Sequence, residues 1–500
     1  MQTRRKFLRG SAVTMGGAAL ALSPGATALA RPGRGGYGRL VEDPNGLLDL
    51  PQGFIYRVVQ TVEDTLSNGA GVPGDFDGMV ALAGPRRTTL LVRNHELTPS
   101  DTTKNPVPQT NPYAADVPGG TTALIVRPDG SLARSYVSSS GTLNNCAGGG
   151  TPWGTWITCE ESRETNHGYA FEVDPRDPEN DISKTPIRGM GFFSHEAIAI
   201  DSRTGIAYLT EDDFRGQQVE PGAEVPEGPD GTFTRSSFLY RYLPDNRSAR
   251  PGALQEGGKL QAMAIQQRPQ YNVDLGVTRE RFQVVWIDVD PEDPHADALA
   301  GGGARFQRLE GCHFAGGAFW FDDTSGGEKR HGQVFRLLPS GDPTGGGTDI
   351  LELFLEGDAE RQMDAPDNLT VTPWGDIWLA EDGGGINRIV GITPEGQSYT
   401  FARNRLVGGD EEGNTSELAG PTFSPDGRTF FVNIQNPGHP FAITGPFAER
   451  SAAGRRRLAA ADPSHPWAPK VSGRQREAAE QNGMSTSEVA AFERLGVSLA

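Results

Sequence analysis

The chain has 500 residues, enough for a large repeat domain whose core needs no disulfides. Its 66 glycines and 37 prolines favour short strands and turns over long helices. The formal net charge of −18 argues against nucleic acid and anionic membrane surfaces as partners. Cys146, Cys159 and Cys312 form no C-x-x-C pair, which argues against a zinc ribbon or a thioredoxin-like site.

The first predicted element is an export signal over residues 1–30. Arg4 and Arg5 lie in TRRKFL, an apolar stretch of small residues follows, and residues 28–30 form an A-x-A cleavage sequence. The pattern predicts a twin-arginine signal, and the alternative is an ordinary secretory signal. We therefore expect the twin-arginine export machinery as a partner and a periplasmic or secreted protein. No later segment is apolar enough for stable membrane insertion.

Between residues 40 and 448 the chain repeats one small β-unit. In TPWGTWITCEE, Glu160 follows the turn glycine Gly154 by six residues, and in TPWGDIWLAED, Glu381 follows Gly375 by six. TGIAYLTEDD, GGAFWFDD and DGRTFFVNIQ show the same offset, and RRTTLLVRNHE is a looser copy. Aromatic and β-branched residues precede each polar end, as is typical of strands.

Each of these strands follows another strand that has a polar residue near its beginning. The polar residues of these preceding strands are Asp77, Cys146, Glu196, Glu310, Asp367 and Glu417. The chain therefore contains six β-hairpins, which predict an all-β fold, a six-bladed β-propeller with long loop insertions. Residues 449–500 read as a linker and a short helical tail, and we expect a monomer.

In a propeller the innermost strands face one another, so the polar residues of the six hairpins should converge. The acids concerned are Glu96, Glu160, Glu161, Glu196, Glu211, Asp212, Glu310, Asp367, Glu381 and Asp382. So many carboxylates together would repel one another unless cations bind, and carboxylate oxygens suit Ca²⁺, Mg²⁺ or Mn²⁺. A single such acid is more simply an exposed strand end, but several at one repeat position indicate a metal site.

Two other side chains suggest what else binds at the centre. The Cys146 thiolate, with the imidazole of His95 or His195, would suit a transition metal such as iron, although either histidine could instead hydrogen-bond a ligand. Arg308 shares a strand face with Glu310, and an arginine fork beside metal ions suits a phosphate group. The alternative for Arg308 is a salt bridge that neutralises one acid.

These motifs together resemble the PhoX-type alkaline phosphatases. The resemblance rests on the signal and on RNHE (93–96), NNCAGG (144–149), TCEES (158–162), SHEA (194–197), LTEDD (209–213), RLEG (308–311), APDNL (365–369) and AEDG (380–383). It implies a six-bladed propeller that releases phosphate from small phosphorylated substrates at an Fe³⁺ and Ca²⁺ site.

The resemblance also implies roles for single residues. Cys146 would be the thiolate ligand of iron, and Glu196, Glu310 and one of Glu160 or Glu161 would share the iron and calcium ions. Calcium would also bind Glu211, Asp367 and Glu381, and Arg308 would hold the phosphate. Arg308, Glu310 and Glu196 are thus the expected catalytic residues.

Two other functions remain open at this point. A calcium-dependent propeller lactonase or esterase would need no thiolate and no iron. A non-catalytic, calcium-stabilised secreted propeller would hydrolyse neither phosphoesters nor lactones. The sequence contains no GxSxG, which argues against an α/β-hydrolase, so we expect a metal-dependent mechanism without a serine intermediate.

Overall fold

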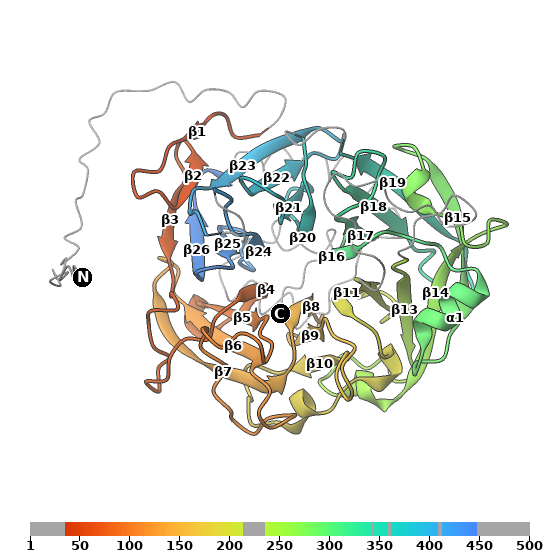
Figure 1. Cartoon of the computed structure of the whole chain (residues 1–500), viewed down its shortest axis with the longest axis horizontal. Coiled ribbons are helices and arrows are strands. Elements are labelled where there is room, and N and C mark those ends of the chain that lie inside the picture. Colours follow the sequence, from red (N-terminus) through yellow and green to blue (C-terminus); the bar gives the residue numbers. More distant parts are fainter. Residues whose placement is uncertain (1–35, 214–235, 343, 358–361, 409–412, 448–500) are drawn as a thin grey trace, which may run out of the picture.

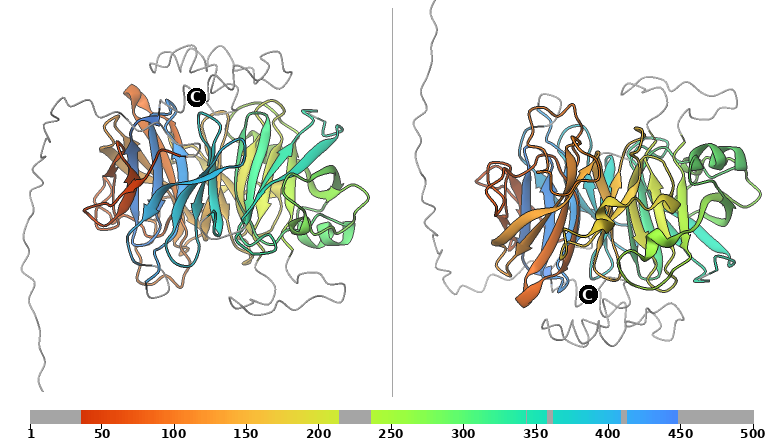
Figure 2. Two further views of the ribbon diagram at one scale, coloured as in Figure 1. Left: turned by 90° about the horizontal axis from the view of Figure 1, so that it is seen from above. Right: turned by 90° about the horizontal axis from the view of Figure 1, so that it is seen from below.

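The structure is a computed structural model that describes residues 36–213, 236–342, 344–357, 362–408 and 413–447. Within these residues the chain forms strands β1 to β26 and a single α-helix. The strands build sheets around a common centre (Figure 1), and side views show a disc (Figure 2). The expected all-β class and the propeller-like arrangement are therefore confirmed.

Six innermost strands contact one another in sequence, and the last contacts the first, so they close a ring around the centre. These strands are β4 (Phe76–Ala83), β8 (Asn145–Gly150), β11 (His195–Ile200), β16 (Leu309–Ala315), β20 (Pro366–Val371) and β24 (Leu418–Phe423). Each of the six expected hairpins supplies one of them.

Each innermost strand pairs antiparallel with the strand that follows it along the chain. These second strands are β5 (Thr89–His95), β9 (Trp156–Glu160), β12 (Ala207–Glu211), β17 (Ala318–Asp323), β21 (Ile377–Glu381) and β25 (Thr429–Ile434). The connecting turns need a positive φ, which Gly154 supplies at 84° and Gly375 at 92°. The TPWG sequences therefore recur because they make these turns.

Further strands extend the hairpins outwards. They are β6 (Gly119–Val126), β7 (Leu132–Thr142), β10 (Ala170–Val173), β13 (Leu239–Pro244), β14 (Gly258–Ile265), β15 (Arg281–Asp288), β18 (Gln333–Leu338), β19 (Asp349–Glu356), β22 (Arg388–Ile392), β23 (Ser398–Asn404) and β26 (His439–Thr444).

Hydrogen bonding divides the strands into five sheets, so the described residues do not form six separate blades. One sheet has nine strands and contains two of the innermost strands, β11 at one end and β16 at the other. The two halves join because β15 pairs with β14 on one side and with β19 on the other. The propeller-like arrangement is therefore confirmed, but hydrogen bonding does not separate the described strands into six blades.

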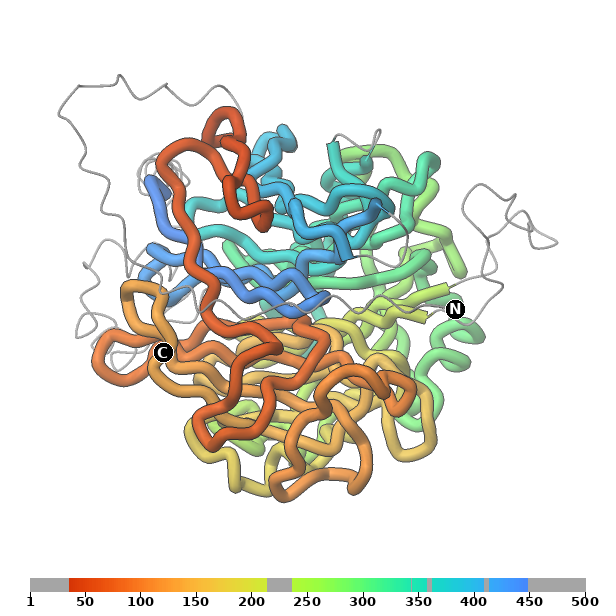
Figure 3. Tube along the Cα trace, turned by 60° about the vertical axis from the view of Figure 1, so that its left-hand side comes forward, coloured from red at the N-terminus to blue at the C-terminus, as the bar shows by residue number. Residues whose placement is uncertain are grey.

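Strands from the beginning of the described chain complete the last two sheets. β3 (Ile55–Val58) pairs with β26, and β2 (Leu48–Pro51), which carries β1 (Leu40–Val41), pairs with β23. Figure 3 shows this N-terminal segment in red beside the blue C-terminal strands. These pairings tie the two ends of the propeller together, so the ring is held closed by backbone hydrogen bonds.

Neighbouring sheets pack face to face through large apolar side chains. The buried Trp378 ring of β21 lies 4.8 Å from that of Phe430 on β25 in the neighbouring sheet, and 4.1 Å from that of Phe401 in its own sheet, measured between centroids. Such aromatic pairs contribute roughly 0.5–1.5 kcal/mol each beyond burial of their area. The sheets are therefore held by packing, which leaves the strand ends at the centre available for polar residues.

The helices are short and peripheral. Asp293 caps α1 (Pro294–Gly301) at its N-terminus. The 3₁₀ turns are η1 (Pro85–Arg87), η2 (Asp181–Lys184), η3 (Arg188–Met190), η4 (Ala253–Glu256) and η5 (Val273–Leu275). Among the described residues no helix has the length and apolar character that crossing a membrane requires. The expected signal over 1–30 and the expected tail over 449–500 lie outside the described residues.

Candidate metal centre

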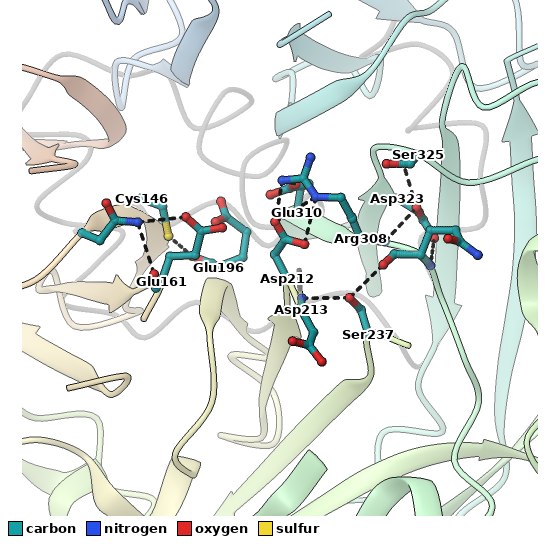
Figure 4. A network of polar contacts seen from close by, with 12 residues as sticks. Cys146, Glu161, Glu196, Asp212, Asp213, Ser237, Arg308, Glu310, Asp323 and Ser325 are labelled. Atoms are coloured by element: carbon teal, nitrogen blue, oxygen red, sulfur yellow. Dashed lines mark hydrogen bonds and ion pairs between the residues drawn. The ribbon is translucent and has the colours of Figure 1, made fainter. Parts of the chain in front are cut away.

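Carboxylates and one thiol from different sheets meet at the centre of the ring. Three groups each bring ligand atoms within 4.8 Å of one another: Cys146, Glu161 and Glu196; Glu196, Glu310 and Asp367; and Asp77, Asp367 and Glu417. Glu196 belongs to the first two groups and Asp367 to the last two. The three groups therefore form one continuous cluster, part of which Figure 4 shows.

The charge of this cluster fits bound cations. Burial, followed by the charges of neighbouring carboxylates, raises the pKa of Glu196 and Asp77 well above the usual range. The carboxyl oxygen Oδ1 of Asp77 is buried and has no hydrogen-bond partner among the described residues. Ionised carboxylates this close are stable only if positive charge compensates them. Hard cations with oxygen ligands would supply that charge.

The thiol of Cys146 adds a softer ligand to one side of the cluster. Its Sγ lies 3.2 Å from the carbonyl oxygen of His195 and 3.6 Å from that of Glu196. Burial first, and then the nearby carboxylates of Glu196 and Glu161, raise the pKa of this thiol. A thiolate at this position therefore needs a cation, and a sulfur ligand suits a transition metal.

Arg308 lies at the edge of the same cluster. Its Nε is 3.0 Å from both carboxyl oxygens of Asp212, and its Nη2 is 2.8 Å from Oε1 of Glu310. Burial alone would lower the pKa of Arg308, but the carboxylates of Asp212 and Glu310 raise it above its usual value. The side chain is 29% exposed, so a ligand can reach its permanent positive charge.

Several of the expected ligands belong to none of the three central groups: Asp212 pairs with Arg308, and Glu160, Glu381 and Glu211 have local partners. Glu160 accepts hydrogen bonds from the backbone N–H groups of Leu143, Gly168 and Tyr169. Glu381 accepts from the backbone of Asp364, at 2.9 Å, and pairs with the side chain of Arg388. Their carboxylates are thus already satisfied by local partners.

Glu211 is the third of these acids. It accepts hydrogen bonds from the N–H of Phe238 and the hydroxyl of Tyr240, and lies 2.9 Å from His295 Nδ1. With Asp213 and His295 it forms a separate group of possible ligands, away from the shared cluster. Arg163 lies 3.5 Å from Glu211, which already places a positive charge there.

The comparisons with known proteins concern the chain as a whole. Residues 35–134 and 129–438 match the profile of a family described as alkaline phosphatase PhoX. The chain belongs to this family. Membership supports a phosphatase. A comparison of the sequence with curated proteins gives no match.

Solved structures similar to this chain include PhoX from Pseudomonas fluorescens in complex with vanadate, a transition-state analogue. It is 18% identical, the match covers 80% of this chain and 96% of that one, and the TM-score is 0.59. A putative gluconolactonase is 13% identical over 80% of this chain and 94% of its own, with a TM-score of 0.40. The first likeness supports the PhoX fold, and the second is too distant to bear on function.

The structure also shows cluster members that the sequence did not identify as ligands. Asp77 and Glu417 stood out only as polar residues near the beginnings of two strands, yet both lie in the central cluster.

Glu96, which was expected at the centre, lies beside the cluster. Gln435 Nε2 donates to it at 2.7 Å, and burial raises its pKa to about 7. Asp382 is close enough to Asp367 and Glu417 to raise their pKa values.

Both histidines considered as ligands are engaged elsewhere. His95 Nδ1 lies 2.6 Å from the carbonyl oxygen of Gly74, and its Nε2 lies 2.8 Å from the Thr122 hydroxyl. His195 stacks on Phe193, and its Nε2 lies 3.0 Å from the Gly191 carbonyl oxygen. Burial lowers the pKa of both imidazoles. Neither histidine belongs to the groups of possible ligands among the described residues, and His195 Nδ1 is buried without a hydrogen-bond partner among them.

Proposed function

We propose that this chain is an exported, metal-dependent phosphatase that hydrolyses phosphate monoesters at the central cluster. One observation carries the proposal: a thiol, several buried carboxylates and a partly exposed arginine meet at one place in a chain of the PhoX family. The cluster can hold cations, and Arg308 can hold an anion beside them. A phosphate monoester is an anion that such a site would bind and polarise.

The residues suggest how two kinds of ion would be divided. Cys146, Glu161 and Glu196 offer one sulfur and two carboxylates, which suits Fe³⁺. Glu310, Asp367, Asp77 and Glu417 offer oxygen ligands alone, which suit Ca²⁺. When bound, the ions would supply Lewis-acid catalysis and neutralise the charge of the phosphate oxygens.

Arg308 would bind and orient the phosphate group. Its Nε and Nη2 are held by Asp212 and Glu310, whereas Nη1 has no partner in the part of the chain that the structure describes. Nη1 can therefore donate to a phosphate oxygen without breaking the pair with Asp212. Because the guanidinium is already oriented, little conformational entropy is lost when the substrate binds.

We further propose that the nine-stranded sheet be counted as two blades joined at their outer edges. Six innermost strands in a closed ring support this count, because each supplies one inward-facing segment.

The protein would act as a monomer with small phosphorylated substrates, after export by the twin-arginine machinery. Replacing Arg4 and Arg5 by lysines should then block export, and unchanged export would point to an ordinary secretory signal.

The test is hydrolysis of p-nitrophenyl phosphate, with iron and calcium quantified on the same exported protein. We expect turnover with both metals bound, and loss of turnover and of calcium in Glu310→Ala. Glu352→Gln is the control, because Glu352 is buried among arginines on β19, far along the sheet from the cluster. Calcium without iron or phosphatase activity would overturn the proposal. Lactone hydrolysis would then indicate a lactonase or esterase, and no hydrolysis a binding protein.

A further inference from the structure

The backbone segment that carries Arg308 is held by Asp323 at the end of β17. One carboxyl oxygen of Asp323 accepts the N–H of Gln307 at 2.9 Å, and the other accepts those of Arg308, at 3.2 Å, and Ser325. The Ser237 hydroxyl donates to the carbonyl oxygen of Gln307 from the other side. Figure 4 shows Asp323, Ser325 and Ser237 on its right, beside Arg308, whose position depends directly on Asp323.

A second acid, Asp274 in η5, is buried against Asp323. Its carboxyl group lies next to that of Asp323, whose strand partner, Gln333, contacts Asp274. Asp274 is only 3% exposed, and neither of its carboxyl oxygens has a hydrogen-bond donor of ordinary geometry among the described residues. Gln333 donates to the backbone carbonyl oxygen of Asp274 and so helps to hold it there. The two carboxyl groups thus face each other, and the neutral side chain of Gln307 lies beside Asp274 as a weak donor.

Two carboxylates in contact and out of water cannot both be ionised, so the pair must share a proton or a cation. A calcium ion requires six to eight oxygen ligands, and Asp323 already uses its oxygens on three backbone N–H groups. No group of three ligating side chains among the described residues includes either acid. A shared proton needs no further ligand and is therefore the better solution.

The surroundings decide which acid carries the proton. Three backbone donors stabilise the ionised form of Asp323, and Asp274 has none. Burial raises the pKa of both groups, that of Asp323 to about 6 and that of Asp274 well above its usual range. The charges of Asp323 and Glu356 raise the pKa of Asp274 further, the neutral Gln307 side chain lowers it through a hydrogen bond, and the Gln333 side chain is neutral.

We propose that Asp274, in its protonated form, donates a hydrogen bond to Asp323 and thereby acts as a positioning residue for Arg308. The protonated acid fixes the orientation of the Asp323 carboxylate, which in turn fixes the N–H groups of residues 307 and 308. This inference rests on the proposed function, in which Arg308 holds the phosphate.

The kinetic test compares Asp274→Leu, which fills the space without a donor, with Asp274→Asn, whose amide can still donate to Asp323. We expect kcat/KM for p-nitrophenyl phosphate to fall about tenfold in the leucine variant and to stay within about twofold of wild type in the asparagine variant. In an Arg308→Lys background the leucine substitution should cause no further loss, because both changes act through one group. An equal loss in both backgrounds would show general destabilisation and overturn the proposal.

Two measurements do not depend on activity. Infrared difference spectra of the metal-loaded protein, wild type minus Asp274→Asn, should show the carbonyl band of a protonated carboxylic acid. Hydrogen exchange of a peptide that covers residues 306–310 should be faster in Asp274→Leu and unchanged in Asp274→Asn. Asp349→Asn is the control for both, because Asp349 is equally buried but pairs with Arg241.

The outcomes separate this inference from the proposed function. A wild-type protein that shows the infrared band and the exchange pattern but hydrolyses no phosphomonoester would refute only the proposed function. A missing band, or an asparagine variant as impaired as the leucine variant, would overturn the role of the proton. Loss of one bound divalent ion in Asp274→Asn would instead show that a cation joins the two acids.

Discussion

Removing the metal ions should make the stability of the protein fall as the pH rises. Burial and neighbouring carboxylates raise the pKa of Glu161, Glu196, Glu310 and Asp367 in the folded chain without metal. A carboxyl group with a raised pKa binds its proton more tightly when folded than when unfolded. The free energy of unfolding is therefore highest below the unfolded pKa and decreases as the pH rises through the folded pKa.

Glu96 gives a magnitude for one group of this kind. Its pKa rises from 4.5 to about 7, mainly through burial. At pH values above the folded pKa this carboxyl would lower the free energy of unfolding by about 3 kcal/mol. The figure is an upper bound, because Glu96 is only partly buried and water screens its charge. The cluster acids add to the effect with the same sign.

The assay is thermal unfolding, followed by near-ultraviolet circular dichroism, of protein stripped with a chelator. The stripped protein should melt at a lower temperature at about pH 8 than at about pH 5, and Ca²⁺ should raise the melting temperature more at the higher pH, because only ionised carboxylates bind it. Glu310→Gln should weaken this pH dependence, whereas Glu352→Gln should not. Equal stability of the stripped wild type at both pH values would refute the reasoning.

Three further predictions concern single side chains. Arg308→Lys should lower kcat/KM by about ten- to a hundredfold with metal content unchanged, because lysine cannot reproduce the charge-assisted fork to Asp212, and an unchanged value would exclude phosphate binding by Arg308. Cys146→Ser should lose iron and retain calcium, as metal analysis would show; retained iron would exclude the thiolate. Glu161→Gln should lose bound metal, whereas Glu160→Gln should keep its metal but lose about 1–3 kcal/mol of unfolding free energy in denaturant titrations. Metal loss in Glu160→Gln alone would reverse that assignment.

The hairpins were predictable because their signals are local. A positive-φ glycine, aromatic and β-branched residues and a polar end recur at short range, and all six pairs form. The division into five sheets was not predictable. It depends on the pairing of β15 with β19, which joins residues about seventy positions apart and depends on the packing of outer strands.

The cluster was predictable as a convergence of acids, but not in its membership. Glu196, Glu310, Asp367 and Cys146 belong to it because they lie at the beginnings of innermost strands. Asp77 lies in an equivalent position but was not identified as a ligand, because a lone polar residue at a strand start has no local signal of its role. An acid that acts as a ligand differs from an acid at an exposed strand end only because it lies close to other acids that are distant in the sequence.

The acid pairs at the ends of the second strands divide their roles because consecutive strand residues face opposite sides. At the ends of β9 and β21 the first acid turns away from the centre: Glu160 binds the N–H of Leu143, and Glu381 binds that of Asp364.

Register explains why these N–H groups are the partners. Glu160 pairs with Asn145 and Glu381 with Pro366, so each acid reaches the residue two positions before its strand partner. That residue lies in the loop that enters an innermost strand, so the first acid fixes where the strand and its central ligand begin. The second acid, as Glu161 shows, is then free to join the cluster. The pair at the end of β9 therefore joins a structural acid, Glu160, to a central one, Glu161.

The same strand register identifies which acid at the end of β17, Asp322 or Asp323, corresponds to Glu160 and Glu381. Leu309 pairs with Asp323, so Asp323 corresponds to Glu160 and Glu381, although the offset of six from Gly316 points to Asp322. Asp323 accordingly binds the N–H of Gln307, two positions before Leu309. For Glu160 and Glu381 this contact positions a strand, but here the same contact also positions Arg308, which is why the proposed hydrogen bond from a second acid, Asp274, would matter at this strand.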